Sequence, residues 1–186
     1  TIKALTVAAG LDSGAITPAT TYYDAGYLDF DEFTISNYDG KGRGYVDMQE
    51  VLNQSLNTGV SFIVDEMGGD TFADYMQDLK LGTETGIDLP GEMYGLTNNL
   101  TTRRPVELAT ASFGQGIALT PIATVRALAT LGNGGTLISP HVVREVRYEN
   151  GDVHTVQFPD GERVFSRETS ETISRMLTKV VDDALV

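Results

Sequence analysis

The 186-residue sequence has no cysteine, which excludes disulfides, thiolate catalysis and cysteine-type zinc sites. It has only two histidines, His141 and His154, too few to form a histidine-based metal site without help from carboxylates. We therefore expect neither a metal nor a cofactor. A protein without cysteine that relies on packing suits an extracytoplasmic compartment.

Positive charge is also scarce, because 13 Lys and Arg face 26 Asp and Glu, giving a formal net charge of −13. Nucleic acid is excluded as a partner, since a phosphate backbone needs Lys and Arg to neutralise it. Nothing attracts the chain electrostatically to anionic lipid.

The sequence holds no apolar run long enough to cross a bilayer and no signal peptide. Its length and 41% hydrophobic content suit one domain with a packed core.

Hydrophobic periodicity and capping residues predict a mostly helical chain. An amphipathic helix is expected over residues 3–13. Asp47 and Glu50 form a capping box, and Pro105 and Pro121 suit first helical turns. Ser166 is expected to cap a final helix. The remaining helices are expected at 47–54, 58–67, 70–79, 105–112 and 121–131.

The rest of the chain is predicted as loops and one β-hairpin. Residues 15–45 are expected to be irregular and residues 83–102 to form a long connection. A strand over 136–148 should turn at 149–152, where Asn-Gly favours positive φ, and return over 153–158. We find no internal repeat and no linker that would divide the chain.

Ser55 and Asn57 are a candidate pair for one cleft. On a helix, side chains two residues apart diverge, whereas in loop or extended backbone they can point the same way. The flanking helical patterns place this pair in such a loop. Lys3 is a candidate base near the start of a helix, where a cation is mildly unfavourable and its pKa is therefore more easily lowered.

Several segments accompany this pair in a fixed order. They are Thr1-Ile2-Lys3, Ser55-Leu56-Asn57, Thr85-Gly86-Ile87-Asp88-Leu89-Pro90-Gly91-Glu92, the stretch 111–121, the glycine-rich 131–135, and Pro140-His141. Together they resemble the transpeptidase domain of class B penicillin-binding proteins over nearly the whole chain. The stretch from Ser112 to Pro121 is the most specific part, and the Ser-x-x-Lys, Ser-x-Asn and Lys-Thr-Gly motif set is the one typical of this superfamily.

The resemblance implies the α+β fold of a penicillin-binding-protein transpeptidase, of which this chain would be mainly the helical lobe, one β-hairpin and a following helix. Residues 1–186 would form a single partial domain. The nucleophilic serine of Ser-x-x-Lys would immediately precede Thr1, and the Lys-Thr-Gly strand would follow Val186. We therefore expect the fragment alone to be inactive. An N-terminal anchor upstream of this chain would hold the protein at the extracytoplasmic face of the bacterial membrane.

The resemblance also implies roles for individual residues. Lys3 would be the base, Ser55 a proton relay, and Asn57 a donor to the substrate carbonyl that also holds Lys3. The turn Gly114-Gln115-Gly116 would lie close to the cleft. The implied activity is that of a peptidoglycan D,D-transpeptidase, which cross-links stem peptides ending in D-Ala-D-Ala through a serine acyl-enzyme and is acylated by β-lactams. The cell-wall synthesis machinery would be its partner.

Other readings remain open at this point. A β-lactam sensor or a cell-wall scaffold of the same fold would lack turnover of peptide, and a β-lactamase would deacylate rapidly. Thr1 could instead be an N-terminal nucleophile. Arg103 and Arg104 could bind a carboxylate or simply lie at the surface, while His141 is expected to be structural.

Overall fold

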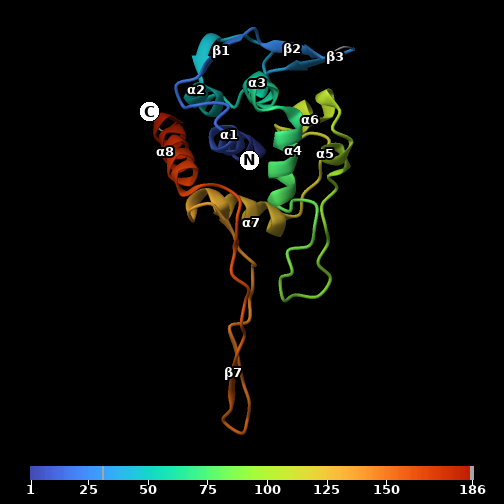
Figure 1. The fold of residues 1–186 in the computed structure, drawn as a ribbon, viewed down its shortest axis with the longest axis vertical. Helices are drawn as coiled ribbons and strands as arrows, with labels where there is room; N and C mark the ends of the chain where they lie inside the picture. Colours follow the sequence, from blue (N-terminus) through green and yellow to red (C-terminus); the bar gives the residue numbers. More distant parts are fainter. Residues whose placement is uncertain (31, 185–186) are drawn as a thin grey trace.

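The computed structural model describes residues 1–30 and 32–184, in which helices surround one central helix (Figure 1). The helices are α1 (Ile2–Asp12), α2 (Met48–Asn53), α3 (Asn57–Met67), α4 (Gly69–Asp78), α5 (Asn98–Thr102), α6 (Pro105–Ala111), α7 (Pro121–Gly132) and α8 (Arg167–Ala184). The strands are β1 (Thr21–Asp24), β2 (Tyr27–Phe30), β3 (Phe33–Ser36), β4 (Gly44–Asp47), β5 (Thr136–Leu137), β6 (Glu145–Arg147), β7 (Val153–Thr155) and β8 (Glu162–Arg163).

Helix α1 forms the centre of the core. It packs against α2, α3, α4, α7 and α8, and eight of its eleven residues are buried. The prediction of a helix here is confirmed, but its predicted amphipathic character is wrong. A helix that other helices enclose on several sides needs apolar or small residues all round, and α1 provides them.

Polar side chains fasten this central helix to its neighbours. Asp12, at the C-terminal end of α1, accepts a hydrogen bond from the Ser166 backbone N–H (2.8 Å) and another from the Tyr75 hydroxyl (2.9 Å). These bonds help to hold the pKa of Asp12 below its usual value despite its partial burial. One carboxylate thus joins α1 to α4 and to the start of α8.

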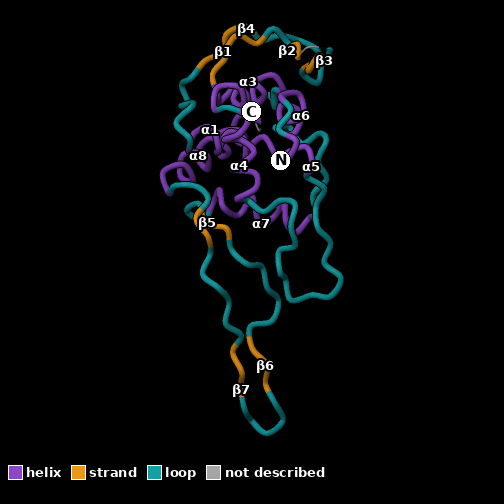
Figure 2. Tube along the Cα trace, turned by 45° about the vertical axis from the view of Figure 1, so that its right-hand side comes forward, coloured by secondary structure: helices purple, strands orange, loops and turns teal. Residues whose placement is uncertain are grey.

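Residues 15–45 were predicted to be irregular, and this is wrong. They contain strands β1, β2 and β3, and β1 pairs antiparallel with β4 while β2 pairs with β3. Each strand has only four residues, which is too short for a clear alternating pattern among the surrounding Gly and Asp. We call residues 21–30 and 32–47 the β-arm, and it lies over the N-terminal end of α3 (Figures 1 and 2).

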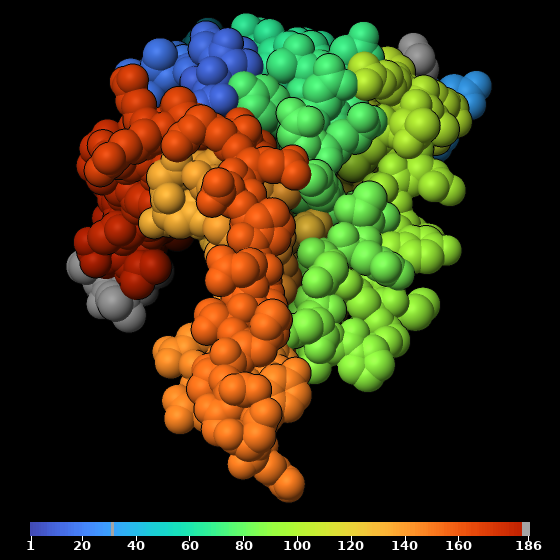
Figure 3. Space-filling model, turned by 60° about the horizontal axis from the view of Figure 1, so that its bottom comes forward, coloured from blue at the N-terminus to red at the C-terminus, as the bar shows by residue number. Residues whose placement is uncertain are grey.

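The predicted hairpin exists, but it is broken into short pairs. The expected strand 136–148 is reduced to β5 and β6, which pair with β8 and β7 respectively. The segment between β5 and β6 contains Pro140, which cannot donate a ladder hydrogen bond. At the tip, only Gly151 of the Asn-Gly pair has a positive φ, 93°. The hairpin projects from the helical body (Figures 1 and 3).

The connection 83–102 contains the short helix α5, which the sequence analysis missed. It also fastens the base of the hairpin, because the Asp88 carboxylate accepts hydrogen bonds from the backbone N–H groups of Val142 (2.7 Å) and Val143 (2.8 Å). Glu92 closes the turn beside it by accepting from the N–H groups of Thr85 and Gly86. These bonds give a structural role to both acidic residues of the segment 85–92.

The predicted N-caps at Asp47 and Ser166 are confirmed, but only the Asp47 half of the predicted capping box forms, because the Glu50 carboxylate accepts from Asn53 and Gln54 instead. Asp47 accepts a hydrogen bond from the Glu50 N–H (2.9 Å), and Ser166 accepts one from the Thr169 N–H (3.1 Å). Thr120 caps α7, and Pro105 and Pro121 occupy first-turn positions. These signals were readable from the sequence because each acts within four residues.

Candidate active site

The loop between α2 and α3 presents Ser55 to solvent. Ser55 has a φ of 53°, in the left-handed region that a non-glycine residue adopts only at some cost. The next residue, Leu56, is 1% exposed and anchors the loop in the core. The residue that carries the exposed hydroxyl is therefore held in place by a buried neighbour in the sequence.

Lys3 reaches this hydroxyl from the first turn of α1. Its Nζ donates to Ser55 Oγ (3.0 Å) and also to the Ser55 carbonyl oxygen. Partial burial lowers the pKa of Lys3 to about 8, because the cation loses hydration. An amine with such a pKa is partly neutral near pH 7 and can accept a proton.

Lys3 and Ser55 line a cavity of about 310 Å³ at the N-terminal end of α1. Apolar side chains from α2, α7 and α8 form much of the remaining wall. The full lining is Thr1, Lys3, Ala4, Leu52, Ser55, Leu128, Leu177 and Val180. The amine and the hydroxyl therefore border one cavity while they contact each other.

Asn57 is the first residue of α3, and its side chain points toward the β-arm. Its Nδ2 donates to the Ser36 carbonyl oxygen (2.8 Å). The hydrogen bonds of the described residues link Lys3 with Ser55 and do not include one between Lys3 and Asn57. The structure thus brings two of the three predicted catalytic side chains into contact and holds the third by a different partner.

The turn Gly114-Gln115-Gly116 follows α6 and lies against α1. Gly114 and Gly116 have positive φ values of 90° and 72°. A Cβ at Gly114 would lie 3.3 Å from Ile2 Cγ1, while Gln115 is exposed. The predicted turn therefore lies beside the same end of α1 as Lys3.

The remaining candidates lie outside the Lys3 cavity. Arg103 forms ion pairs with Asp70 (2.8 Å) and Asp74 (2.6 Å). Its guanidinium is therefore already bound by two carboxylates of α4. His141 stacks on Phe158 with ring centroids 3.7 Å apart, at the base of the hairpin. A larger cavity of about 680 Å³ lies between the C-terminal end of α7 and α8 and contains none of the predicted site residues.

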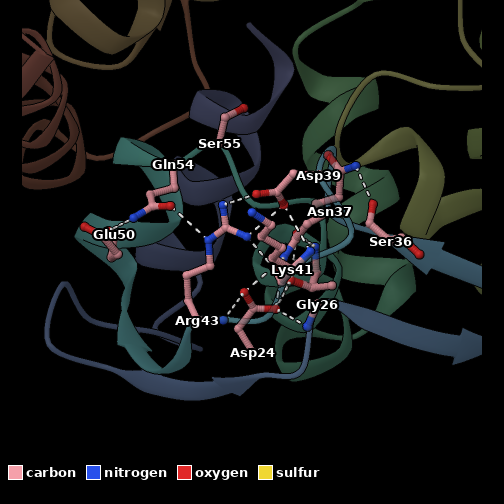
Figure 4. Close-up of polar contacts among 12 residues, drawn as sticks. Asp24, Gly26, Ser36, Asn37, Asp39, Lys41, Arg43, Glu50, Gln54 and Ser55 are labelled. Carbon is pink, nitrogen blue, oxygen red and sulfur yellow. Dashed lines mark hydrogen bonds and ion pairs between the residues drawn. The ribbon is translucent and has the colours of Figure 1, made fainter.

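The sequence analysis missed a buried polar cluster next to the Ser55 loop. Asp24 is 1% exposed and Asn37 is 5% exposed, and Figure 4 shows these two residues near Gly26. Both contact Thr58 at the start of α3. The only local signal was Asp24-Ala25-Gly26, where the Asp24 carboxylate accepts from the Gly26 N–H (2.9 Å) in an Asx turn. Nothing local indicated contact with Thr58, which is 34 residues further along the chain.

Comparison with known proteins shows the family to which the chain belongs. A family model described as the penicillin binding protein transpeptidase domain matches residues 1–185. The chain belongs to this family. Its similarity to stage V sporulation protein D of Bacillus subtilis (strain 168) is 34% identity over 184 residues, covering 97% of this chain and 28% of that protein.

The chain is also similar to a second relative in sequence and to a third protein in structure. The peptidoglycan D,D-transpeptidase MrdA of Acinetobacter baumannii is 31% identical, covering 98% of this chain and 28% of that protein. The crystal structure of penicillin binding protein 3 from Mycobacterium tuberculosis, complexed with aztreonam, superimposes with a TM-score of 0.89. It is 24% identical and covers 97% of this chain and 40% of that one, and it shows the shared fold. The predicted transpeptidase fold is confirmed.

The chain spans less than a third of the length of these two curated relatives. Within residues 1–30 and 32–184, none of the helices is both long enough and apolar enough to cross a membrane.

Proposed function

We propose that the protein carrying this chain is a peptidoglycan D,D-transpeptidase that acts through a serine acyl-enzyme. One observation carries the proposal, namely the hydrogen bond between the half-buried amine of Lys3 and the exposed hydroxyl of Ser55. Acyl transfer needs a base with a pKa near the working pH and a second group that can pass the proton on. Membership of the transpeptidase family supports the assignment.

In the proposed reaction, the serine expected immediately before Thr1 lies one helical turn from Lys3. Neutral Lys3 takes the serine proton while the serine oxygen attacks the carbonyl of the D-Ala-D-Ala bond. The C–N bond then breaks, and the proton passes through Ser55 to the amine of the leaving D-Ala. An amine of a neighbouring stem peptide then attacks the ester carbonyl and loses its proton to neutral Lys3. The C–O bond to the serine breaks, and Lys3 returns that proton to the serine oxygen.

The proposed binding residues are Asn57 and the turn Gly114-Gln115-Gly116. The Asn57 amide would donate to the peptide carbonyl of the substrate, and the turn would border the cleft. A β-lactam would acylate the same serine because its ring amide imitates the scissile bond. The oxyanion site and the site for the substrate carboxylate would need the Lys-Thr-Gly strand expected beyond Val186.

Residues 1–186 would accordingly be one part of a single transpeptidase domain. The remainder of the domain would cover the cavity of Lys3 and Ser55. We propose that the protein works at the extracytoplasmic face of the bacterial membrane, held by an anchor upstream of this chain. Stem peptides ending in D-Ala-D-Ala and the cell-wall synthesis machinery would be its partners.

The test is acylation by a labelled penicillin, on protein that includes the residue before Thr1 and continues past Val186. We expect stable labelling of that residue and loss of labelling in Lys3→Ala. Release of D-Ala from a pentapeptide by the same sample separates a transpeptidase from a β-lactam sensor. Absence of labelling in folded protein would contradict the acyl-enzyme proposal.

A further inference from the structure

The N-terminal end of α3 receives its cap from the β-arm. The N-cap residue Leu56 has no side-chain acceptor, and helix termini leave N–H groups that need partners. Asn37 supplies one, because its Oδ1 accepts from the Thr58 backbone N–H (3.2 Å) and from Thr58 Oγ1 (3.0 Å). A residue 21 positions away thus does what a local N-cap normally does.

Asp24 fixes the orientation of this distant cap. The Asn37 amide nitrogen donates to both Asp24 oxygens, at 3.0 and 2.9 Å, which leaves the Asn37 oxygen turned toward α3. Thr58 Oγ1 also lies 2.9 Å from Asp24 Oδ1. The backbone N–H groups of Gly26 and Arg43 complete the set at 2.9 and 3.1 Å. A buried carboxylate with this many donors is well satisfied.

The same part of the β-arm holds Asn57. Ser36 and Asn37 are adjacent, and they bind the Asn57 side chain and the Thr58 backbone respectively. On the other side of the loop, Arg43 Nε donates to Gln54 Oε1 (2.9 Å), the residue before Ser55. The loop is therefore held from the β-arm at both ends. Figure 4 shows the labelled Gln54 and Arg43 on one side and Ser36 on the other.

The Arg43 side chain is itself fixed by a two-point ion pair. Its Nη1 and Nη2 donate to the two oxygens of Asp39, at 2.8 and 2.9 Å. Because a paired guanidinium has a fixed direction, its bond to Gln54 also has a fixed direction.

We propose that Asp24 and Asn37 are positioning residues for the acyl-transfer reaction, because they fix the start of α3 and with it the position of Asn57 relative to Ser55 and Lys3. This inference rests on the proposed function. Neither residue would touch substrate, and each acts through Thr58, Ser36 and Asn57. A loop displaced by about 1 Å can slow a positioned reaction by roughly a hundredfold.

The informative substitution is Asn37→Asp, which changes one amide to a carboxyl group facing Asp24. When both groups are ionised they repel each other, and when one is protonated an O–H···O bond can replace the lost N–H···O bond. The other ionisable groups facing this cluster are Tyr22, whose pKa burial raises to about 12, and Arg43, which is paired with Asp39. A pH-dependent effect of this substitution would therefore come from the pair of facing carboxyl groups that it creates.

The experiment uses full-length protein and labelled penicillin, with rates measured at saturating penicillin and divided by the parent rate at each pH. We expect Asn37→Asp to acylate at least roughly tenfold more slowly at pH 8.5 and to approach the parent toward pH 5.5. Adding Asp24→Asn restores one amide and one carboxylate, so the double variant should recover at pH 8.5. A role in overall folding alone would not produce a pH-dependent rate with reversal by the second substitution.

A matched control lies at the hairpin tip, where Asn150 Nδ2 also donates to an aspartate, Asp152 (2.7 Å), but in solvent. Asn150→Asp should keep the parent rate at every pH. Folded Asn37→Asp that acylates at the parent rate throughout would overturn the proposal. If that variant does not fold, Thr58→Val must slow acylation while Thr58→Ser keeps the parent rate, and equal rates in the two would overturn it.

Amide hydrogen exchange separates this inference from the proposed function. Residues 57–60 should exchange faster in Asn37→Asp at pH 8.5 than in the parent, whether or not the protein reacts with penicillin. A parent that is not labelled would refute the acyl-enzyme function, and the exchange result would then decide alone whether the network fixes the loop. Unchanged exchange in folded Asn37→Asp would refute the network's role.

Discussion

At the scale of single residues, the site depends on one amine placed where it loses water. Lys3 lies in the first turn of α1, and its Nζ meets Ser55, 52 residues further along the chain. Its pKa falls to about 8 because burial disfavours the charged form. At pH 7 roughly a tenth of such an amine is neutral, which is several hundredfold more than for an exposed lysine.

This pKa predicts the pH dependence of acylation. The neutral amine is the form that accepts the serine proton, so the rate constant should rise with pH through about 8 and then level off. We expect Lys3→Arg to be slow at every pH, because a guanidinium stays protonated. Stopped-flow acylation by a labelled penicillin between pH 6 and 9 measures both, and a flat profile for the parent would contradict Lys3 as the base.

At the scale of elements, the short turns between helices and strands depend on closely packed glycines. The junction after α7 contains Gly134 and Gly135, whose φ values are 85° and 88°. A Cβ on Gly134 would meet nothing within 4 Å, whereas a Cβ on Gly135 would collide with the backbone of Phe165. Phe165 is 1% exposed and belongs to the core, so it cannot easily move away.

These neighbouring glycines allow a matched comparison. We expect Gly134→Ala to lower the free energy of unfolding by about 1 kcal/mol, which is the cost of a left-handed backbone for alanine. Gly135→Ala should cost roughly 3 kcal/mol or more, because the collision adds to the same backbone cost. Urea unfolding followed by circular dichroism measures the difference, and equal losses would show that the Phe165 contact is not tight.

At the scale of the whole molecule, the helical body and the projecting hairpin differ in how they are held. The body is built around buried α1, whereas β6 and β7 are mostly exposed and make only a short two-stranded sheet. Asp88 holds the base of the hairpin through two backbone N–H groups. The hairpin should therefore open locally at much lower cost than the body unfolds.

Limited proteolysis tests this difference in stability. In the hairpin, the first trypsin cuts should come after Arg144 or Arg147, which are exposed. Trypsin should spare Arg126 in α7, which is 6% exposed. The nicked protein should keep its labelling by penicillin, because the hairpin does not line the Lys3 cavity. Mass spectrometry identifies the first cuts, and initial cleavage within α1 or α7 would contradict this account.

The sequence by itself determined the features that depend on near neighbours. The caps by Asp47, Thr120 and Ser166 act within a few residues, and most helices follow from periodicity. The order of the motifs was enough to indicate the family. The loop position of Ser55 also followed from local pattern, because the turn lies between two clear helical segments.

Only the tertiary structure decided the features that join distant segments. The pKa of Lys3 depends on burial, which no local pattern reports. The four-residue strands of the β-arm gain their order from pairing and from contact with α3, and the role of Asn37 as a cap for Thr58 exists only once that contact forms. Likewise α1 is recognised as the buried centre only when five other helices pack around it. The physical reason is common to all of these, since burial and hydrogen bonding between residues far apart in sequence are set by the packed fold.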